Sequence, residues 1–276
     1  MSAAVLACSL AAIDCAAQVP PSRFTLRSKA VGATYTLDVV VPQGGATGGK
    51  RLPVAYCTDW FVLADYLRSL PKLLDMGRLT GPFIMVGISE GATQHDWAMA
   101  RNRDFTPARP TDAYSRENVY TPALEKAGGA GRFVAFLKDE LIPLIEARFP
   151  ADPARRAFVG YSLGALLGTH LLHREPGVFQ YYLLGSSSLW FNQFQLATEF
   201  GSAPADTLRS IKKVYLSVGE GESWEMLKGY GMLRDALHDK GFGASRMKAE
   251  IVADAGHVGA MPISLYNGLR FLFARE

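Results

Sequence analysis

The chain has 276 residues, of which 49% are hydrophobic and 20% are charged, and these proportions exclude a largely disordered protein. Its 29 basic and 26 acidic side chains leave a formal net charge of +3, which is too small and too scattered to indicate a nucleic-acid-binding protein. A single α/β domain of this length is common, and it buries enough surface to fold without disulfides or a structural metal.

The first twenty residues differ in composition from the rest of the chain. They are Ala-rich and nearly uncharged, with an apolar run over Ala3–Ile13. Residues 1–20 are interpreted either as a secretory leader or as a disordered N-terminus before a catalytic domain at residues 21–276. A leader over residues 1–17 would make the mature protein periplasmic or secreted; without one, it is cytoplasmic. No stretch offers the ~18 uninterrupted apolar residues of a transmembrane helix, so no membrane span is expected.

Apolar runs alternate with helical patterns along most of the chain. Strands are predicted at Arg23–Lys29, Thr34–Val41, Leu52–Thr58, Pro82–Ser89, Arg156–Tyr161, Tyr181–Gly185, Lys213–Val218 and Lys248–Val252. Helices are predicted at Phe61–Met76, Gly131–Phe149, Ala165–His173, Glu225–Lys240 and Ile263–Ala274. The alternation predicts a mostly parallel sheet with helices on both faces. The first two strands have no helix between them and should form an antiparallel edge.

One stretch fits neither pattern. From Glu90 to Lys126 the sequence has no clear hydrophobic period and is rich in Arg, Asp, Thr and Pro. It is therefore predicted to be a long functional loop.

The strongest motif is the G-x-S-x-G sequence Gly160-Tyr161-Ser162-Leu163-Gly164. It lies between a predicted strand and a predicted helix, which is the setting in which this motif forms a nucleophile elbow. The tight turn strains the serine backbone, and the flanking glycines leave room for it. The hydroxyl then projects above the sheet at the positive N-terminus of the helix. Ser162 is the candidate nucleophile.

A serine nucleophile needs a base, and the chain has five histidines. His257 follows the last predicted strand and precedes the last helix, where the general base should lie. His170 and His173 lie on the helix after the elbow; their spacing suits a metal, but no acidic or Cys partner is near in sequence, so no metal site is predicted. His95 stays open as a pocket residue, and His238 is predicted to be solvated.

The acid that orients the base should follow the strand Lys213–Val218. Glu220 and Glu222 both lie there, and Glu222 is favoured because the acid in this fold usually lies a few residues past the strand end. Asp254 is a third candidate. The order serine, acid, histidine is that of the α/β-hydrolase fold. The oxyanion hole needs two backbone N–H groups, predicted at Leu163 and at Trp60 or Phe61.

These residues resemble the putative esterase, or esterase D-like, family of α/β hydrolases, which includes siderophore esterases, feruloyl esterases, S-formylglutathione hydrolases and mycolyltransferases. The resemblance runs from about Thr34 to Phe273. Beyond the elbow it rests on LPVAYCTDW, ARNRDFTP, GGAGRFVAFLKDELIPLIEARF, FQYYLLGSSSLWFN, VYLSVGEGE and AGHVGAMP. The segments RNRDFTP and GGAGRFVAFLKDELIPLIEARF most resemble the siderophore-esterase-like subgroup.

The resemblance implies an α/β-hydrolase fold without a separate lid domain. It also implies a serine esterase with Ser162, Glu222 and His257 as its triad, acting on a small-molecule ester with no cofactor. Glu222 matches the family pattern of an acid three residues after a glycine, here Gly219. One departure stands out: family members usually have Asp-Gly after the third strand, whereas this chain has Asp59-Trp60, so the oxyanion loop should have a different shape.

Three further residues are candidate substrate contacts. Arg101 and Arg103 are interpreted as a cationic wall for an anionic substrate such as a catecholate or carboxylate. For Arg103, a structural pair with Asp104 is an equal alternative. Trp190, together with the tryptophan and phenylalanine of the oxyanion loop, is interpreted as an apolar acyl or aryl wall, with core packing as the alternative.

The sequence thus predicts a serine carboxylic-ester hydrolase that works through an acyl-enzyme. Two alternatives stay open. An acyltransferase would use the same residues with an alcohol in place of water. A non-catalytic binding protein on the same fold would explain the unusual oxyanion loop.

Overall fold

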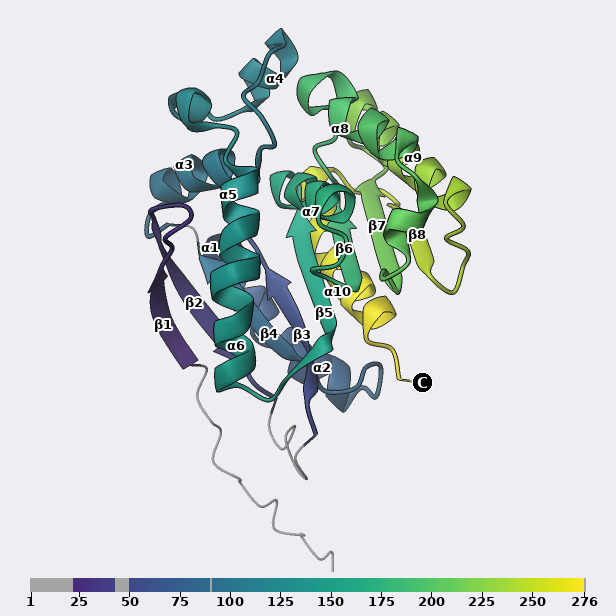
Figure 1. Cartoon of the computed structure of the whole chain (residues 1–276). Helices are drawn as coiled ribbons and strands as arrows, with labels where there is room; N and C mark the ends of the chain where they lie inside the picture. Colours follow the sequence, from purple (N-terminus) through teal and green to yellow (C-terminus); the bar gives the residue numbers. More distant parts are fainter. Residues whose placement is uncertain (1–21, 43–49, 90, 276) are drawn as a thin grey trace, which may run out of the picture.

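The structure is a computed structural model that describes residues 22–42, 50–89 and 91–275. An eight-stranded sheet runs through its centre in the order β1-β2-β4-β3-β5-β6-β7-β8 (Figure 1). The strands are β1 (Ser22–Arg27), β2 (Thr34–Val40), β3 (Leu52–Cys57), β4 (Ile84–Ser89), β5 (Ala151–Tyr161), β6 (Tyr181–Gly185), β7 (Lys213–Gly219) and β8 (Met247–Val252). β1 pairs antiparallel with β2, β2 pairs antiparallel with β4, and the remaining pairs are parallel. The predicted parallel sheet and its antiparallel edge are confirmed, and the predicted leader over residues 1–20 lies outside the described residues.

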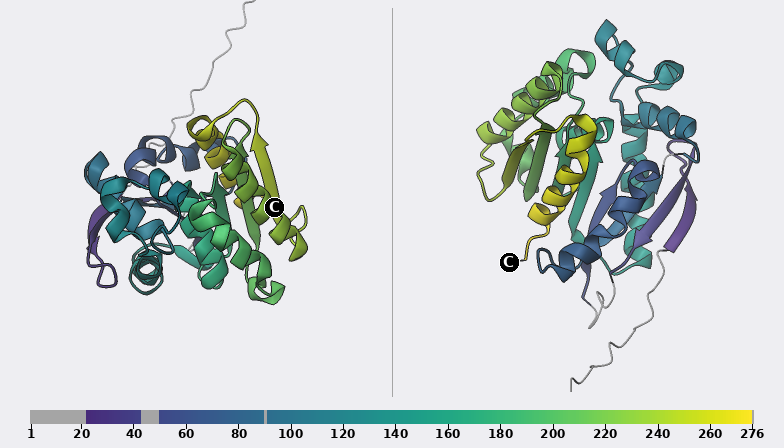
Figure 2. Two further views of the ribbon diagram at one scale, coloured as in Figure 1. Left: turned by 90° about the horizontal axis from the view of Figure 1, so that it is seen from above. Right: turned by 180° about the vertical axis from the view of Figure 1, so that it is seen from behind.

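Helices cover both faces of this sheet, as the front and rear views show (Figures 1 and 2). They are α1 (Trp60–Leu67), α2 (Leu70–Met76), α3 (Gln94–Phe105), α4 (Ala113–Asn118), η2 (Thr121–Lys126), α5 (Ala130–Ala135), η3 (Phe136–Leu141), α6 (Ile142–Arg148), α7 (Leu163–Arg174), α8 (Phe191–Ser202), η4 (Ala205–Leu208), α9 (Trp224–Asp239) and α10 (His257–Leu272). Within residues 22–42, 50–89 and 91–275, none of these helices has the length and apolar character needed to cross a bilayer.

Two separate apolar cores lie on the two faces of the sheet. Neighbouring residues of a strand point to opposite faces, so Phe158 packs in one core while Ala157 and Val159 pack in the other. The first core includes α5 to α9, and the second includes α1, α2 and α10. Burial on both faces explains why the parallel strands appear in the sequence as continuous apolar runs.

The predicted long loop from Glu90 to Lys126 is wrong, because most of it folds into α3, α4 and η2. The side chains of Thr93 and Asp112 cap α3 and α4 by accepting backbone N–H groups three residues on. The buried face of α3 includes the polar side chains of Asn102 and Asp104. A helix that buries polar groups lacks the apolar period by which helices are predicted from sequence.

Two predicted helices are present but divided. The helix predicted over Gly131–Phe149 contains a π-helical turn, η3, between α5 and α6. Pro143 follows that turn and has no N–H to donate, so a wider turn before it is a common accommodation. The helix predicted over Phe61–Met76 is broken into α1 and α2, and α8 was not predicted at all.

Candidate active site

The candidate catalytic residues gather at one end of the sheet. Ser162 directly follows β5, Glu222 lies three residues after the end of β7, and His257 is the first residue of α10, which follows β8. Because β5 to β8 are parallel, the ends of all four lie at the same edge, the upper one in Figure 1. Ligand sites of open α/β sheets lie at this edge.

Ser162 has the strained backbone of a nucleophile elbow, with φ 59° and ψ −120°. A side chain at Gly160 would collide with the backbone of Gly164, so the tight turn requires glycine there. The Ser162 N–H donates to the Gly185 carbonyl at 2.9 Å, which ties the elbow to the neighbouring strand β6. The Ser162 hydroxyl lies 3.3 Å from the Ser188 hydroxyl.

Glu222 and His257 form a close pair, with 2.6 Å between Glu222 Oε2 and His257 Nδ1. The Glu222 side chain is 1% exposed, whereas that of His257 is 41% exposed. Burial raises the pKa of Glu222, but hydrogen bonds from His257, Ser186 and the Gly219 N–H outweigh it and leave the pKa below its usual value. The pair therefore joins an ionised, buried carboxylate to an imidazole that solvent reaches.

Two residues that the sequence did not single out support this pair. Ser186, the first residue after β6, has φ 42° and donates its hydroxyl to Glu222 Oε1 at 2.6 Å. The Tyr161 hydroxyl donates to the His257 backbone carbonyl at 2.6 Å and lies 2.7 Å from Ser186 Oγ. Burial raises the pKa of Tyr161, so its phenol keeps the proton it donates. The position of Ser186 directly after a buried strand was the only sequence signal for its role.

The two other candidate acids interact with each other rather than with His257. The backbone N–H of Asp254 donates to Glu220 Oε2 at 3.0 Å. Asp254 has a left-handed backbone, with φ 53°, and both side chains are exposed. The structure therefore brings Glu222, and neither Glu220 nor Asp254, to the histidine.

The other histidines lie away from this pair. Burial, helped by Arg174, lowers the pKa of His170 to about 4, which indicates a neutral packing residue. His173 and His238 each lie 3.8 Å from an acidic side chain, and His95 bonds to the Tyr120 hydroxyl at 2.9 Å. Across the described parts of the chain, no three His, Cys, Asp or Glu side chains form a group that could hold a metal.

The candidate oxyanion loop begins at Asp59, whose backbone is left-handed (φ 56°), and continues into α1. The Trp60 side chain is buried in the core, and its indole N–H donates to Asp38 at 2.7 Å. The interpretation of Trp60 as a substrate wall is therefore wrong, although its backbone N–H stays available. Phe61 is partly exposed and stacks on Trp97 with 6.3 Å between ring centroids.

The two arginines of the predicted cationic wall are both paired with carboxylates. Arg103 makes two 2.7 Å bonds to Asp104, which confirms the structural alternative for this residue. Arg101 donates from Nε to Asp59 at 2.8 Å and from Nη2 at 3.3 Å. Arg101 and Arg103 therefore do not form the predicted cationic wall of free guanidinium groups. Trp190 is largely buried and directs its indole N–H to the Met226 sulfur at 3.1 Å.

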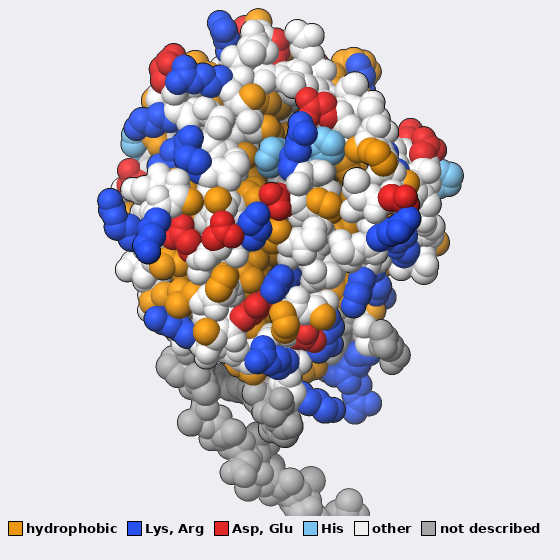
Figure 3. Space-filling model, in the orientation of Figure 1, with side chains coloured by type: hydrophobic (Ala, Val, Ile, Leu, Met, Phe, Trp, Pro, Cys, Tyr) orange, Lys and Arg blue, Asp and Glu red, His pale blue; other side chains and the backbone are white. Residues whose placement is uncertain are grey.

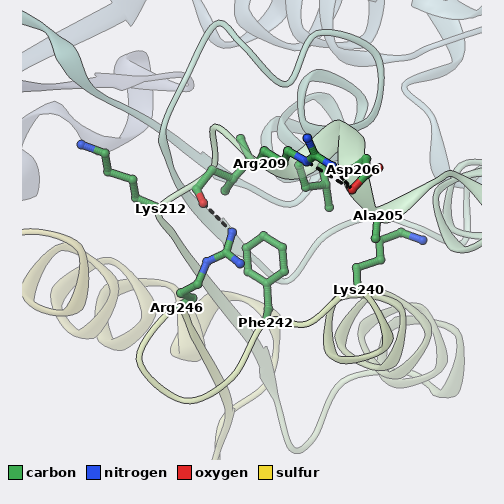
Figure 4. A pocket seen from close by; sticks show the side chains of 9 residues that line it. Ala205, Asp206, Arg209, Lys212, Lys240, Phe242 and Arg246 are labelled. Carbon is green, nitrogen blue, oxygen red and sulfur yellow. Dashed lines mark hydrogen bonds and ion pairs between the residues drawn. The ribbon is translucent and has the colours of Figure 1, made fainter.

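Figure 3 shows Lys and Arg spread over the visible face with Asp and Glu among them. A cavity of about 570 Å³ near the start of β7 and β8, at the opposite end of the sheet, is lined by Arg209, Lys212, Lys240 and Arg246. Figure 4 shows that the Lys212 and Lys240 ammonium groups point away from each other, and Arg209 pairs with Asp206. These cations do not converge on one ligand position.

Several known proteins resemble this chain in sequence and fold. The model of the family described as putative esterase matches residues 28–228. Ferri-bacillibactin esterase BesA of Bacillus subtilis (strain 168) is 28% identical over 207 residues, which are 69% of this chain and 67% of BesA. The siderophore enterobactin esterase of Emericella nidulans is 32% identical over 175 residues, 60% of this chain and 57% of that protein.

Solved structures show the same fold over nearly the whole chain. The BES protein from Bacillus cereus superposes with a TM-score of 0.76 at 25% identity, covering 93% of this chain and 96% of that one. An IroE-like serine hydrolase from Shewanella oneidensis also gives a TM-score of 0.76 at 25% identity, covering 92% of this chain and 80% of that one. The chain therefore belongs to the putative esterase family, and it is an esterase built on the α/β-hydrolase fold.

Proposed function

We propose that this protein is a serine carboxylic-ester hydrolase with Ser162, His257 and Glu222 as its catalytic triad. The observation that carries the proposal is the 2.6 Å pair between buried Glu222 and half-exposed His257, at the same sheet edge as the strained Ser162 elbow. An ionised carboxylate on Nδ1 fixes the imidazole tautomer and leaves Nε2 to accept a proton. The proposed catalytic domain spans residues 21–276.

The reaction proceeds in two halves. Ser162 Oγ attacks the ester carbonyl carbon while His257 Nε2 takes the hydroxyl proton, and the tetrahedral intermediate then expels the alcohol, which receives that proton. Water attacks the resulting acyl-enzyme, with His257 again as the base, and the acid product leaves. Glu222 remains ionised throughout and stabilises the imidazolium.

The developing oxyanion needs backbone N–H donors. Leu163 is the first residue of α7, so its N–H has no intrahelical acceptor and lies at the positive end of the helix dipole. Trp60 and Phe61 occupy the equivalent positions at the start of α1. We therefore assign the oxyanion hole to the N–H groups of Leu163 and of this pair. One such donor contributes about 10²–10³-fold to kcat.

The proposed substrates are siderophore-like esters with aryl or anionic groups. The names of two relatives specify a siderophore or its ferric complex as the ester they cleave. In this chain Trp224 follows Ser223 near the candidate acid and is 64% exposed, a rare state for tryptophan. It meets Phe194 edge to face, and the Lys228 ammonium lies within 5 Å of both rings. Aromatic faces beside a cation favour an aryl, anionic substrate.

The test is Ser162→Ala assayed on a short p-nitrophenyl ester and on a catecholate siderophore lactone. We expect kcat to fall by at least about 10³-fold on both esters, with exposed Ser202→Ala as the matched control. A fluorophosphonate probe should label the native protein and not the Ser162→Ala variant. Retained turnover, or retained labelling in that variant, would overturn the assignment.

A further inference from the structure

Asp59 occupies the N-cap position of α1, but its side chain does not cap the helix. An aspartate at this position normally accepts a hydrogen bond from one of the first backbone N–H groups of its helix. Here the backbone is left-handed, with φ 56° and ψ 27°, and the buried carboxylate makes no cap bond to the helix.

Instead, the Asp59 carboxylate bonds to two side chains of α3. The Trp97 indole N–H donates to Oδ1 at 2.8 Å, and Arg101 donates to Oδ1 at 2.8 Å and to Oδ2 at 3.3 Å. Trp97 and Arg101 are four residues apart and therefore share one face of the helix. The Arg101 guanidinium lies 4.8 Å from the centroid of the Trp97 ring, so each side chain also fixes the other.

Because the Asp59 carboxylate bonds to α3, it does not cap the first backbone N–H groups of α1. The N–H groups of Val62 and Leu63 donate to the Asp59 carbonyl at 3.1 and 3.2 Å. The N–H groups of Trp60 and Phe61 precede them and have no acceptor within the helix. These two are the oxyanion donors named above. A carboxylate that folded back to cap α1 would place a negative charge where the oxyanion must form.

We propose that Arg101 and Trp97 are positioning residues that hold the Asp59 carboxylate away from the first N–H groups of α1 and so keep the oxyanion hole open. This inference rests on the proposed esterase function. It also replaces the expected substrate contact of Arg101 with a role that acts through Asp59. The bulky Trp60 after Asp59 is compatible with this arrangement, because its side chain is directed into the core.

The test compares Arg101→Ala, Asp59→Gly and the double variant on the p-nitrophenyl ester. Glycine adopts the left-handed backbone of position 59 and has no carboxylate. We expect Arg101→Ala to lower kcat by about 10- to 100-fold with KM within threefold, because the change blocks an oxyanion donor and leaves substrate binding intact. Asp59→Gly alone should lower kcat less than Arg101→Ala does, since no carboxylate remains to fill the oxyanion hole. The double variant should recover at least about threefold over Arg101→Ala, because no carboxylate remains to fill the hole.

Control measurements distinguish the possible results of this test. Thermal unfolding of each variant shows that the fold is intact, and Arg101→Lys should retain more kcat than Arg101→Ala because it keeps the charge. A rise in KM at unchanged kcat would overturn the proposal in favour of direct substrate binding by Arg101, and a double variant no faster than Arg101→Ala would overturn it in favour of a merely structural role. Failure of the proposed function itself would appear differently, as turnover that survives Ser162→Ala.

Discussion

Glu222 and Asp104 are both buried carboxylates, each with a side chain only 1% exposed, yet they lie in very different surroundings. Glu222 lies at the strand-end edge of the sheet and pairs with His257, which solvent reaches. Asp104 lies on α3, where it accepts bonds from Arg103 and from the hydroxyl of Tyr35 on β2, each at 2.7 Å. Burial alone therefore does not distinguish a functional carboxylate from a structural one.

The partner of the carboxylate makes the difference. Histidine gains and loses a proton near neutral pH, so a carboxylate that orients it can take part in proton transfer. Arginine keeps its proton at all ordinary pH values, so the Arg103–Asp104 pair can only hold parts of the fold together. The first pair should therefore affect catalysis, and the second should affect stability.

The largest expected effect is that of Glu222→Gln. The amide cannot hold the imidazole in the required tautomer, so kcat of the folded variant should fall by about 10³- to 10⁴-fold. Turnover of a p-nitrophenyl ester measures this loss, and circular dichroism shows that the variant is folded. Glu220→Gln is the matched control and should keep its activity within a few-fold. A larger loss from Glu220→Gln than from Glu222→Gln would assign the acid to Glu220 instead.

Asp104→Asn should lower the stability of the protein and leave its turnover nearly unchanged. Replacing the buried carboxylate weakens its bonds with Arg103 and Tyr35, so the free energy of unfolding should fall by about 3 kcal/mol. Urea denaturation measures this loss, and kcat/KM of the folded variant should stay within a few-fold of native. A variant of unchanged stability and strongly reduced turnover would show that the scaffold pair contributes to catalysis.

The smallest effect is expected at Glu140, a partly exposed carboxylate on η3. It accepts bonds from the Ser28 hydroxyl and the N–H groups of Lys29 and Ala30, and so fixes the turn between β1 and β2. Glu140→Gln should lower the free energy of unfolding by about 1 kcal/mol at pH 7, with exposed Glu117→Gln as the neutral control.

The Glu140 carboxylate also makes the free energy of unfolding depend on pH. Burial raises the pKa of Glu140, but its hydrogen bonds outweigh this and leave the pKa below its usual value. A lowered folded-state pKa stabilises the protein above the unfolded-state value of about 4.3, and that contribution disappears as pH falls through the folded-state value. The difference between native protein and Glu140→Gln should therefore shrink at acidic pH. A constant difference from pH 7 to pH 3 would contradict this account.

Most of the fold could be predicted because its strands are buried on both faces and its helices mostly follow the apolar period. The segment after Glu90 could not, since α3 buries the polar side chains of Asn102 and Asp104 in place of an apolar stripe. The break within Phe61–Met76 and the π turn before Pro143 depend on local backbone geometry, which hydrophobic periodicity does not report.

The candidate site likewise has residues that could be predicted from the sequence and residues that could not. Ser162, Glu222 and His257 could be placed from motif and order, because the topology fixes which strand ends meet. The partners of Arg101 and Trp60 could not be predicted, since Asp59 and Asp38 lie 42 and 22 residues earlier in the chain and meet them only in the folded protein. Side-chain type predicted a charge at Arg101, but only the three-dimensional contact shows what neutralises it.

The left-handed residues at the strand ends have a consequence for how this enzyme can be altered. Asp59, Ser162, Ser186 and Asp254 follow β3, β5, β6 and β8 at one edge, and such a conformation costs about 1–2 kcal/mol for a residue other than glycine. The functional edge thus contains four strained backbone positions, and the two apolar cores must supply the stability that keeps it in place. Heat-resistant variants are therefore best sought in the cores and at the opposite end of the sheet, where added stability does not compete with turnover.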